Sequence, residues 1–329
     1  MKILCLRFSS IGDIVLTTPV VRVLHEQLGH EVHFVTKKNF APILQANPHV
    51  AKVYVFDKDI AGLIPELKAE RYDQVIDLHH NLRSWRLKRA LGRPSRSFDK
   101  LNMEKWLLVN TGIDLLPGIH IVDRYMATIA HLGGRYDGKG LDFFIPKEEE
   151  VDLSMMPGNL SPDGFLAFVI GATHATKRLP AEKIVDIIGR VSMPVVLLGG
   201  PQEEAAARWI GQQLAGRPVF DCCGRLSLMQ SASVVRQAHK VITHDTGLMH
   251  IAAALGKEIV SIWGSTVPKF GMYPFFADGE SRHSAFGVEG LRCRPCSKIG
   301  FDKCPKGHFR CMKEQSVEAI ALASGRRSG

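Results

Sequence analysis

Short apolar runs alternate with helical spacing through the first half of the chain. Four runs have the length and apolar character of buried strands, at residues 2–8, 31–35, 53–56 and 72–78. Apolar residues at helical spacing fill the intervals at 13–28, 40–46 and 60–70, and Gly29 ends the first of these helices. Strands separated by helices are joined by right-handed crossovers, so the pattern predicts a parallel sheet.

The second half repeats this alternation. Apolar runs at 165–170, 194–198, 240–243 and 258–263 predict strands, and spacing at 180–191 and 204–214 predicts two of the helices between them. Residues 146–162 carry three prolines and the acidic run 148–150, which is typical of a linker. We therefore predict an α/β protein with two Rossmann-like, doubly wound domains, at 1–150 and 163–329, facing one another across a cleft at their strand ends.

Size and composition fit this organisation. The chain has 329 residues, of which 45% are hydrophobic and 23% charged, as in soluble globular proteins. No apolar run approaches the roughly 20 residues that a helix needs to cross a bilayer. Arg7 and Asp13 interrupt the apolar start, and no small-residue cleavage site follows, so residues 1–8 are interpreted as a strand and not a signal peptide. We expect a cytoplasmic protein.

The formal net charge of +9 is concentrated in two segments. They carry Arg83, Arg86, Lys88, Arg89, Arg93, Arg96, Lys100 and Lys105, and then Arg292, Arg294, Lys298, Lys303, Lys306, Arg310 and Lys313. Such patches predict an anionic partner, whether nucleic acid, an anionic membrane face or a phosphorylated substrate; a solvated basic surface accounts equally well for either patch alone. Nucleic acid is disfavoured, because the chain lacks the aromatic-basic interleaving usual for such surfaces.

The seven cysteines fall into two groups. Cys5, Cys222 and Cys223 lie in apolar or turn contexts and are expected to pack as small hydrophobic residues. The other four, Cys293, Cys296, Cys304 and Cys311, have intervals of two, seven and six residues, with His308 among them. This spacing allows a structural zinc site, free thiols or a redox-labile pair, and the sequence leaves all three open.

The segment 244–256 is the most informative in the chain. Asp245, Thr246 and Gly247 fall where a helix begins after a buried strand, and Gly256 falls where that helix ends. Backbone N–H groups at such a helix start are unpaired and favour phosphate. An N-cap accounts for one polar residue but not for His250 in the same apolar helix, so a ligand site is favoured over a cap.

Two further loops follow strands of the second half, at 171–177 and 199–203. Lys177, which follows Thr173, can neutralise a phosphate, or it can be a lysine of the surface. Glu203 can accept hydrogen bonds from a ribose diol, or it can be an acidic residue of the first helical turn, where the helix dipole favours a negative charge. Neither loop has the P-loop or the G-x-G-x-x-G spacing, which argues against a P-loop NTPase and a dinucleotide oxidoreductase. A nucleotide held by the second domain is the simplest interpretation.

In the first half, Gly12 permits a tight turn between the first strand and its helix, and Asp13 follows at the helix start. Asp13 can cap its own helix or remove a proton from an incoming hydroxyl. The helix dipole keeps its carboxylate ionised, which suits a base more than an acid. The residues alone leave the cap and the base equally open.

Three segments carry a family resemblance: 7–13 (Arg-Phe-Ser-Ser-Ile-Gly-Asp), 245–256 (Asp-Thr-Gly-Leu-Met-His, then an Ala-rich helix) and 263–266 (Trp-Gly-Ser-Thr). They resemble glycosyltransferase family 9, the ADP-heptose:lipopolysaccharide heptosyltransferases, and the resemblance runs through nearly the whole chain. It implies a GT-B fold and an inverting transfer from ADP-heptose without metal or cofactor, with Asp13 at the position of the catalytic base. The positions matching the family's donor site are Thr173, Lys177, Glu203, Asp245, Thr246, Gly247 and His250. The cysteine spacing recurs in relatives, which implies a structural role.

The resemblance also implies partners. The expected acceptor is the phosphorylated, lipid-linked inner core of lipopolysaccharide at the cytoplasmic face of the inner membrane, where the enzyme would be peripheral. We expect Ser10, Arg83 and Arg86 to contact this acceptor, and we expect a monomer. Lys177, Thr173 and helix-start amides would take up the charge of departing ADP. The alternative is a GT-B enzyme that uses another nucleotide sugar on a different cell-envelope glycan.

Overall fold

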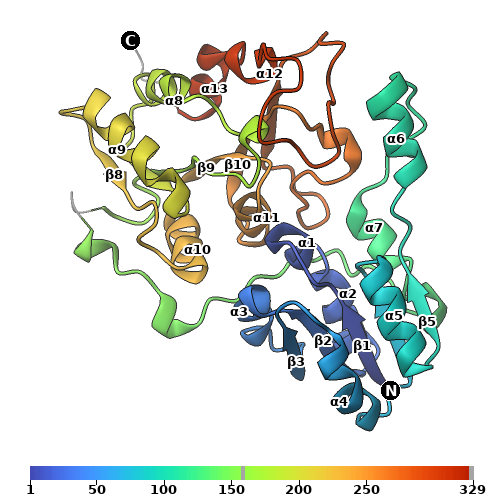
Figure 1. The fold of residues 1–329 in the computed structure, drawn as a ribbon. Coiled ribbons are helices and arrows are strands. Elements are labelled where there is room, and N and C mark those ends of the chain that lie inside the picture. Colours follow the sequence, from blue (N-terminus) through green and yellow to red (C-terminus); the bar gives the residue numbers. More distant parts are fainter. Residues whose placement is uncertain (157–159, 326–329) are drawn as a thin grey trace. The chain divides into compact units, whose positions relative to one another are not determined.

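The computed structural model describes residues 1–156 and 160–325. These residues form two compact units, each built around one parallel β-sheet. Figure 1 shows the course of the chain through both units. Each unit is described separately below.

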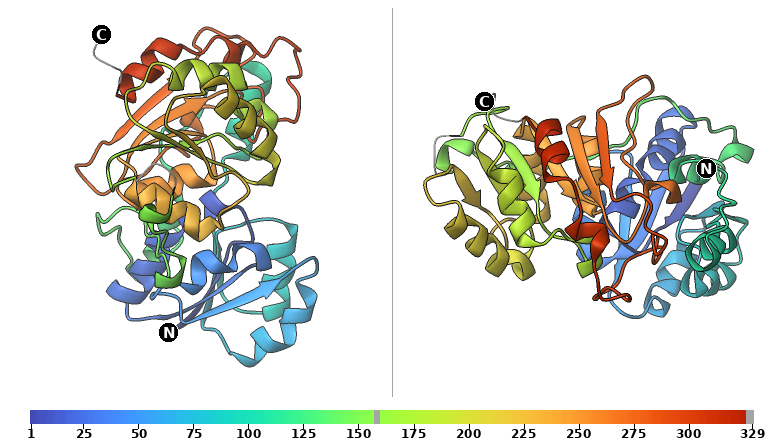
Figure 2. Two further views of the ribbon diagram at one scale, coloured as in Figure 1. Left: turned by 90° about the vertical axis from the view of Figure 1, so that its left-hand side faces the viewer. Right: turned by 90° about the horizontal axis from the view of Figure 1, so that it is seen from above.

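The first unit contains a five-stranded parallel sheet with strand order β3-β2-β1-β4-β5. The strands are β1 (Lys2–Leu6), β2 (Glu31–Lys37), β3 (Lys52–Phe56), β4 (Gln74–Asp77) and β5 (Ser95–Ser97). The helices are α1 (Ile11–Val15), α2 (Thr18–Arg22), α3 (Ala41–Gln45), α4 (Ile64–Ala69), α5 (Leu82–Leu91) and α7 (Ile121–Met126). Helix α1 packs beside α3 and α4 beside α5, and helices cover both faces of the sheet (Figures 1 and 2). The parallel sheet predicted from the alternation is confirmed.

One predicted helix of this unit, at 13–28, is broken into α1, α2 and a π-helical segment at Val23–Gln27. The hydroxyl groups of Thr17 and Thr18 donate to the backbone oxygens of Ile14 and Val15 over 2.7 Å each, and so compete with the helical hydrogen bonds. Pro19 removes one more backbone donor. The prediction of one continuous helix was therefore wrong, although the apolar face that it indicated is buried.

The second unit contains a six-stranded parallel sheet with strand order β11-β10-β9-β6-β7-β8. The strands are β6 (Leu166–Val169), β7 (Val195–Leu198), β8 (Val219–Asp221), β9 (Lys240–His244), β10 (Glu258–Trp263) and β11 (His283–Gly287). The helices are α8 (Ala181–Ile188), α9 (Glu204–Gln213), α10 (Leu228–Gln237), α11 (Gly247–Ala254), α12 (Arg310–Lys313) and α13 (Val317–Ala323), together with α6 (Asn102–Thr111) from the first half of the sequence. Helix α8 packs between α9 and α13, and α10 packs beside α11.

The division into units differs in detail from the domains at 1–150 and 163–329. The chain passes into the second unit at Ile145, and two segments are exchanged: 102–118 belongs to the second unit and 275–279 to the first. Lys298 Nζ donates to Asn102 Oδ1 over 3.2 Å, which ties the first of these segments to the second unit. The backbone N–H of Asp278 donates to the Gly138 oxygen over 2.9 Å, which ties the other to the first unit. Part of the expected linker at 146–162 is ordered against α10, and residues 157–159 lie outside the described residues.

Within the described residues, no helix combines the length and apolar character needed to cross a bilayer.

Candidate active site

Asp13 lies in the first turn of α1, after the carboxyl end of β1. Ser10 occupies the N-cap position, and Asp13 is the third helical residue. Asp13 Oδ2 accepts from the Ser10 backbone N–H over 3.2 Å and from Ser10 Oγ over 2.8 Å. Asp13 is therefore not the N-cap; its carboxylate closes the helix start as the acidic member of a capping box.

Arg7 holds the other oxygen of this carboxylate. Its Nη2 lies 2.7 Å from Asp13 Oδ1, while its Nε donates to the Ser9 oxygen over 2.7 Å and its Nη1 to the Leu78 oxygen over 2.6 Å. Burial raises the pKa of Asp13, but the Arg7 charge and the Ser10 hydrogen bonds outweigh burial and hold that pKa below its ordinary value. Asp13 is therefore ionised at neutral pH. Arg7 was not predicted as a site residue. The feature that could have indicated it is a cationic residue at the end of an apolar strand.

A second buried carboxylate organises the neighbouring strand end. Asp77, at the end of β4 beside β1, is fully buried and accepts from Ser84 Oγ and Lys88 Nζ, each over 2.8 Å. Both partners lie on α5, so the carboxylate fixes the start of that helix. Arg83 and Arg86, the predicted acceptor contacts, project from α5 as exposed side chains.

His79 lies close to Arg7 and Asp13, and its ring packs on Phe8 with centroids 4.6 Å apart. Burial, followed by the Arg7 charge, lowers the pKa of His79 to about 4. This imidazole is therefore neutral at pH 7, and its buried Nδ1 has no hydrogen-bond partner among the described residues.

In the second unit, three strand ends contribute to one polar cluster. Lys177 lies in the loop after β6, and Asp245 follows directly after β9. Lys177 Nζ lies 2.6 Å from Asp245 Oδ2. Thr266, after β10, donates its hydroxyl to the same oxygen over 2.8 Å. The structure thus brings together Lys177 and Asp245, which sequence reasoning had placed in separate loops. Thr266 belongs to the motif 263–266 but had been given no role.

Helix α11 begins at Gly247, directly after this cluster, with Thr246 at the N-cap position. The Thr246 side chain makes no capping hydrogen bond, so it does not accept from the backbone N–H groups of the first turn. His250 lies in this helix and is 2% exposed. His244 is fully buried, and its Nε2 accepts from the Leu179 backbone N–H over 3.0 Å, which is a structural role.

Glu203, after β7, has a well-defined orientation. Its Oε1 accepts from Arg178 Nη1 over 2.9 Å, and its Oε2 accepts from the Gly200 backbone N–H over 3.0 Å. A Cβ on Gly171 would lie 2.9 Å from Glu203 Oε2, so only glycine leaves room for the carboxylate there. Thr173 lies in the same β6 loop and is exposed. Arg178 was missed by sequence reasoning, although it directly follows Lys177.

The cysteine-bearing segment packs behind the turn after β10. Arg294 donates from Nε to the Gly264 oxygen over 2.8 Å and from Nη2 to the Thr266 oxygen over 3.3 Å, and the Cys296 N–H donates to the Ser265 oxygen over 3.0 Å. All seven cysteines are free thiols. Within the described ranges, no group of three or more His, Cys, Asp or Glu side chains is arranged to hold a metal ion. The segment thus supports the turn that carries Thr266.

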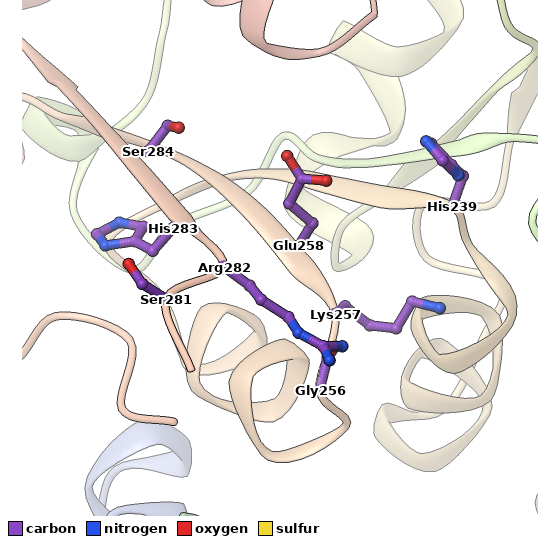
Figure 3. Close-up of a pocket in the computed structure, with 8 residues that line it drawn as sticks. All are labelled: His239, Gly256, Lys257, Glu258, Ser281, Arg282, His283 and Ser284. Atoms are coloured by element: carbon purple, nitrogen blue, oxygen red, sulfur yellow. The ribbon is translucent and has the colours of Figure 1, made fainter. Parts of the chain in front are cut away.

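One pocket of about 460 Å³ lies at the opposite end of the strands. It is lined by His239, Gly256, Lys257, Glu258, Ser281, Arg282, His283 and Ser284, as Figure 3 shows. These residues precede or begin β9, β10 and β11, whereas Asp245 and Thr266 follow β9 and β10. The pocket is therefore separate from the Lys177–Asp245–Thr266 cluster.

Two Rossmann-type parallel sheets, together with the likeness to a solved family 9 glycosyltransferase, define the GT-B fold. The chain belongs to glycosyltransferase family 9 (heptosyltransferase), whose family model matches residues 60–298.

The chain is 27% identical over 328 residues to lipopolysaccharide heptosyltransferase 1 of Pseudomonas aeruginosa, covering 91% of this chain and 86% of that protein. It is 24% identical over 281 residues to lipopolysaccharide heptosyltransferase 3 of Escherichia coli, covering 78% and 80%. The solved family 9 glycosyltransferase of Veillonella parvula matches with a TM-score of 0.78 at 22% identity, over 98% of this chain and 96% of that one. The E. coli heptosyltransferase WaaC with ADP matches with a TM-score of 0.66 at 22% identity, over 98% of both chains. These likenesses confirm the predicted fold class.

Proposed function

We propose that this protein transfers heptose from ADP-heptose to the inner core of lipopolysaccharide, with inversion at the anomeric carbon and without a metal ion. The observation that carries the proposal is the Lys177–Asp245–Thr266 cluster beside the start of α11. A cation next to helix-start amides at the carboxyl ends of parallel strands suits a diphosphate. The relatives named lipopolysaccharide heptosyltransferases and the solved neighbour with ADP support this choice of donor and sugar.

The second unit is proposed to bind the donor. The diphosphate competes with Asp245 for Lys177 and so frees the Asp245 carboxylate to hold a sugar hydroxyl, as His250 does from the same helix start. Thr173, Thr246 and the amide of Gly247 contact phosphate oxygens. Lys177 and these donors take up the charge that grows on ADP as the bond breaks, which is the work that a divalent cation does in other transferases. Glu203, oriented by Arg178, accepts from the ribose diol through its remaining lone pairs.

Asp13 is proposed as the general base. Its low pKa keeps it ionised, and Arg7 and Ser10 fix its orientation. In a single displacement, the Asp13 carboxylate takes the proton of the acceptor hydroxyl while that oxygen attacks the anomeric carbon and ADP leaves from the opposite face. This step inverts the anomeric centre. The reaction requires the donor held by the second unit to meet Asp13 of the first.

The acceptor is proposed to be lipid-linked and phosphorylated, at the cytoplasmic face of the inner membrane. Arg83 and Arg86 are exposed on α5, and Ser10 is exposed at the start of α1. Guanidinium groups suit phosphate because they donate two parallel hydrogen bonds. The enzyme is proposed to act as a peripheral monomer, with no role for nucleic acid.

The test of the base is Asp13→Asn, which keeps the shape of the side chain but removes its basicity. We expect heptose transfer to fall by roughly 10²–10⁴-fold with ADP-heptose binding retained, measured by ADP release and by calorimetric titration. Asp123→Asn is the matched control, because Asp123 also bonds back to the N-cap N–H of its helix, over 3.2 Å from His120 N. Turnover of Asp13→Asn equal to that of Asp123→Asn would refute the assignment.

The test of the donor is a thermal-shift panel of ADP-, GDP- and UDP-sugars. A ligand that binds only the folded state raises stability in proportion to the logarithm of its concentration over its Kd. We expect ADP-heptose to raise the melting temperature most. A larger shift with a GDP- or UDP-sugar would favour the alternative, a GT-B enzyme with another donor.

A further inference from the structure

Helix α6 and the turn after it expose large apolar side chains. None of the ten residues of α6 is buried, although the helix contains Met103, which is 73% exposed, and Trp106, which is 59% exposed. Ile113 and Leu115 follow in the turn and are 52% and 59% exposed. A helix of a globular protein normally buries one apolar face. Helix α6 does not, and a group of exposed large apolar side chains of this kind marks an interaction site.

A second apolar segment of the same unit lies beside the start of α6. Lys298 Nζ donates to Asn102 Oδ1 over 3.2 Å, which joins the loop at 298–301 to the helix. Ile299 and Phe301 in this loop are 57% and 39% exposed. The loop is held in place by the Phe301 N–H, which donates to Thr176 Oγ1 over 2.8 Å. We call the apolar residues of these two segments the α6 surface: Met103, Trp106, Ile113, Leu115, Ile299 and Phe301.

Positive charge accompanies the α6 surface. The segment 298–306 contains Lys298, Lys303 and Lys306 against the single carboxylate of Asp302, and none of the three lysines forms an ion pair within the described parts of the chain. Lys303 and Lys306 are both exposed. Lysines without an ion pair, next to exposed apolar side chains that include a tryptophan, are typical of segments that lie in the interface of a membrane.

We propose that the α6 surface docks on a bilayer that contains anionic lipids. The apolar side chains enter the boundary between headgroups and acyl chains, and the lysines contact phosphate groups of anionic headgroups. An anionic bilayer supplies both an apolar phase and negative charge over one face, whereas an apolar protein partner would leave the lysines uncompensated. This docking deepens the proposed function, because it names the surface through which a peripheral enzyme would reach the membrane, and it rests on that proposed location but not on the identity of the donor.

The experiment is co-sedimentation of the full-length protein with vesicles of phosphatidylethanolamine and phosphatidylglycerol, compared with vesicles of phosphatidylcholine alone. We expect the wild type to bind the anionic vesicles, with a blue shift of its tryptophan fluorescence, and to dissociate as salt is raised. The double variant Met103→Ser/Trp106→Ser should bind them at least about tenfold more weakly. The double variant Lys303→Ser/Lys306→Ser should lose the preference for anionic vesicles.

The matched control is Trp209→Ser/Leu322→Ser, which removes one tryptophan and one aliphatic side chain, 36% and 65% exposed, from α9 and α13. This variant should bind vesicles as the wild type does. ADP release in the absence of vesicles reports on folding and on the transfer site, independently of membrane binding. It should be equal in all variants. Three results would overturn the proposal: no binding of the wild type to anionic vesicles at low salt, equal binding by the α6 variant and the control, or loss of a concentration-dependent dimer in the α6 variant, which would assign the surface to a second copy of the chain.

Discussion

At the residue scale, Arg7 is the group that sets the chemistry of Asp13. Its three nitrogens hold Ser9, Leu78 and the Asp13 carboxylate, so it fixes both the turn and the charge of the proposed base. In Arg7→Met, burial still raises the pKa of Asp13, but the Arg7 charge that lowers it is gone. The pKa of Asp13 therefore rises, and the acidic limb of the kcat profile moves to higher pH. The variant should also lose about 3–5 kcal/mol of stability, because a buried carboxylate loses its partner.

The control for this positioning role is Arg7→Lys, which keeps the cation and loses two of the three contacts. In Arg7→Lys, the acidic limb of the kcat profile, measured between pH 4 and 8, should lie close to that of the wild type. The free energy of unfolding, measured in urea, should remain below that of the wild type. An acidic limb that is the same in the wild type, Arg7→Met and Arg7→Lys would show that Arg7 has a structural role only.

Lys177 is the residue through which a metal requirement can be tested. We expect Lys177→Ala to raise the KM for the donor and lower kcat together, by roughly 10²-fold in kcat/KM, because the cation acts on the leaving diphosphate. Wild-type turnover should be unchanged by EDTA. Lys183→Ala, on α8 of the same unit, removes a lysine that donates to the Gln315 oxygen and should leave both parameters unchanged. If EDTA inactivated the wild type and Mg²⁺ restored its activity, the proposal that Lys177 acts on the diphosphate in place of a metal ion would be contradicted.

At the scale of elements, the sequence predicted the buried strands and the edge strand β3, but it missed the edge strands β5, β8 and β11. β1, β4, β6, β7, β9 and β10 are mostly buried, and their continuous apolar runs are readable. β5 and β8 have three residues each, and β11 is largely exposed, so none has an apolar run to detect. The start of α11 was predictable because its polar residues are adjacent in sequence. Its contact with Lys177 and Thr266 was not, because sheet order determines it.

The turn after β10 gives a prediction at this scale. A Cβ on Gly264 would lie 2.6 Å from the Thr176 oxygen and 2.7 Å from Met312 Cε, so Gly264→Ala must separate this turn from the β6 loop or from the cysteine-bearing segment. We expect a loss of about 1–3 kcal/mol in stability and a higher KM for the donor, because Thr266 no longer holds Asp245. Gly211→Ala is the control, since nothing lies within 4 Å of its Cβ in α9. It should gain about 0.5–1 kcal/mol, and an equal KM in both variants would refute the coupling.

At the scale of the whole molecule, the two-sheet organisation was predictable and the exchanged segments were not. Alternation along the chain determines which sheet a strand joins, because consecutive strands are neighbours more often than not. Segments 102–118 and 275–279 contain no strand, and what assigns them is single side-chain contacts such as the Lys269–Asp114 ion pair and the stacking of Phe275 on His120. Contacts of this kind have no periodicity, so a sequence pattern does not reveal them.

The stability of both units is predicted to fall in mild acid for one shared reason. His79 in the first unit and His244 and His283 in the second have pKa values lowered to about 4, in each case first by burial. An unfolded histidine has a pKa of about 6.5, so between these values the unfolded chain binds more protons than the folded one. The stabilising contribution is therefore full above about pH 6.5 and is lost as the pH falls toward 4. Urea unfolding at pH 7 and at pH 5 should show this loss. His244→Gln should reduce it, whereas exposed His308→Gln should not; equal pH dependence in all three proteins would contradict the assignment to buried neutral histidines.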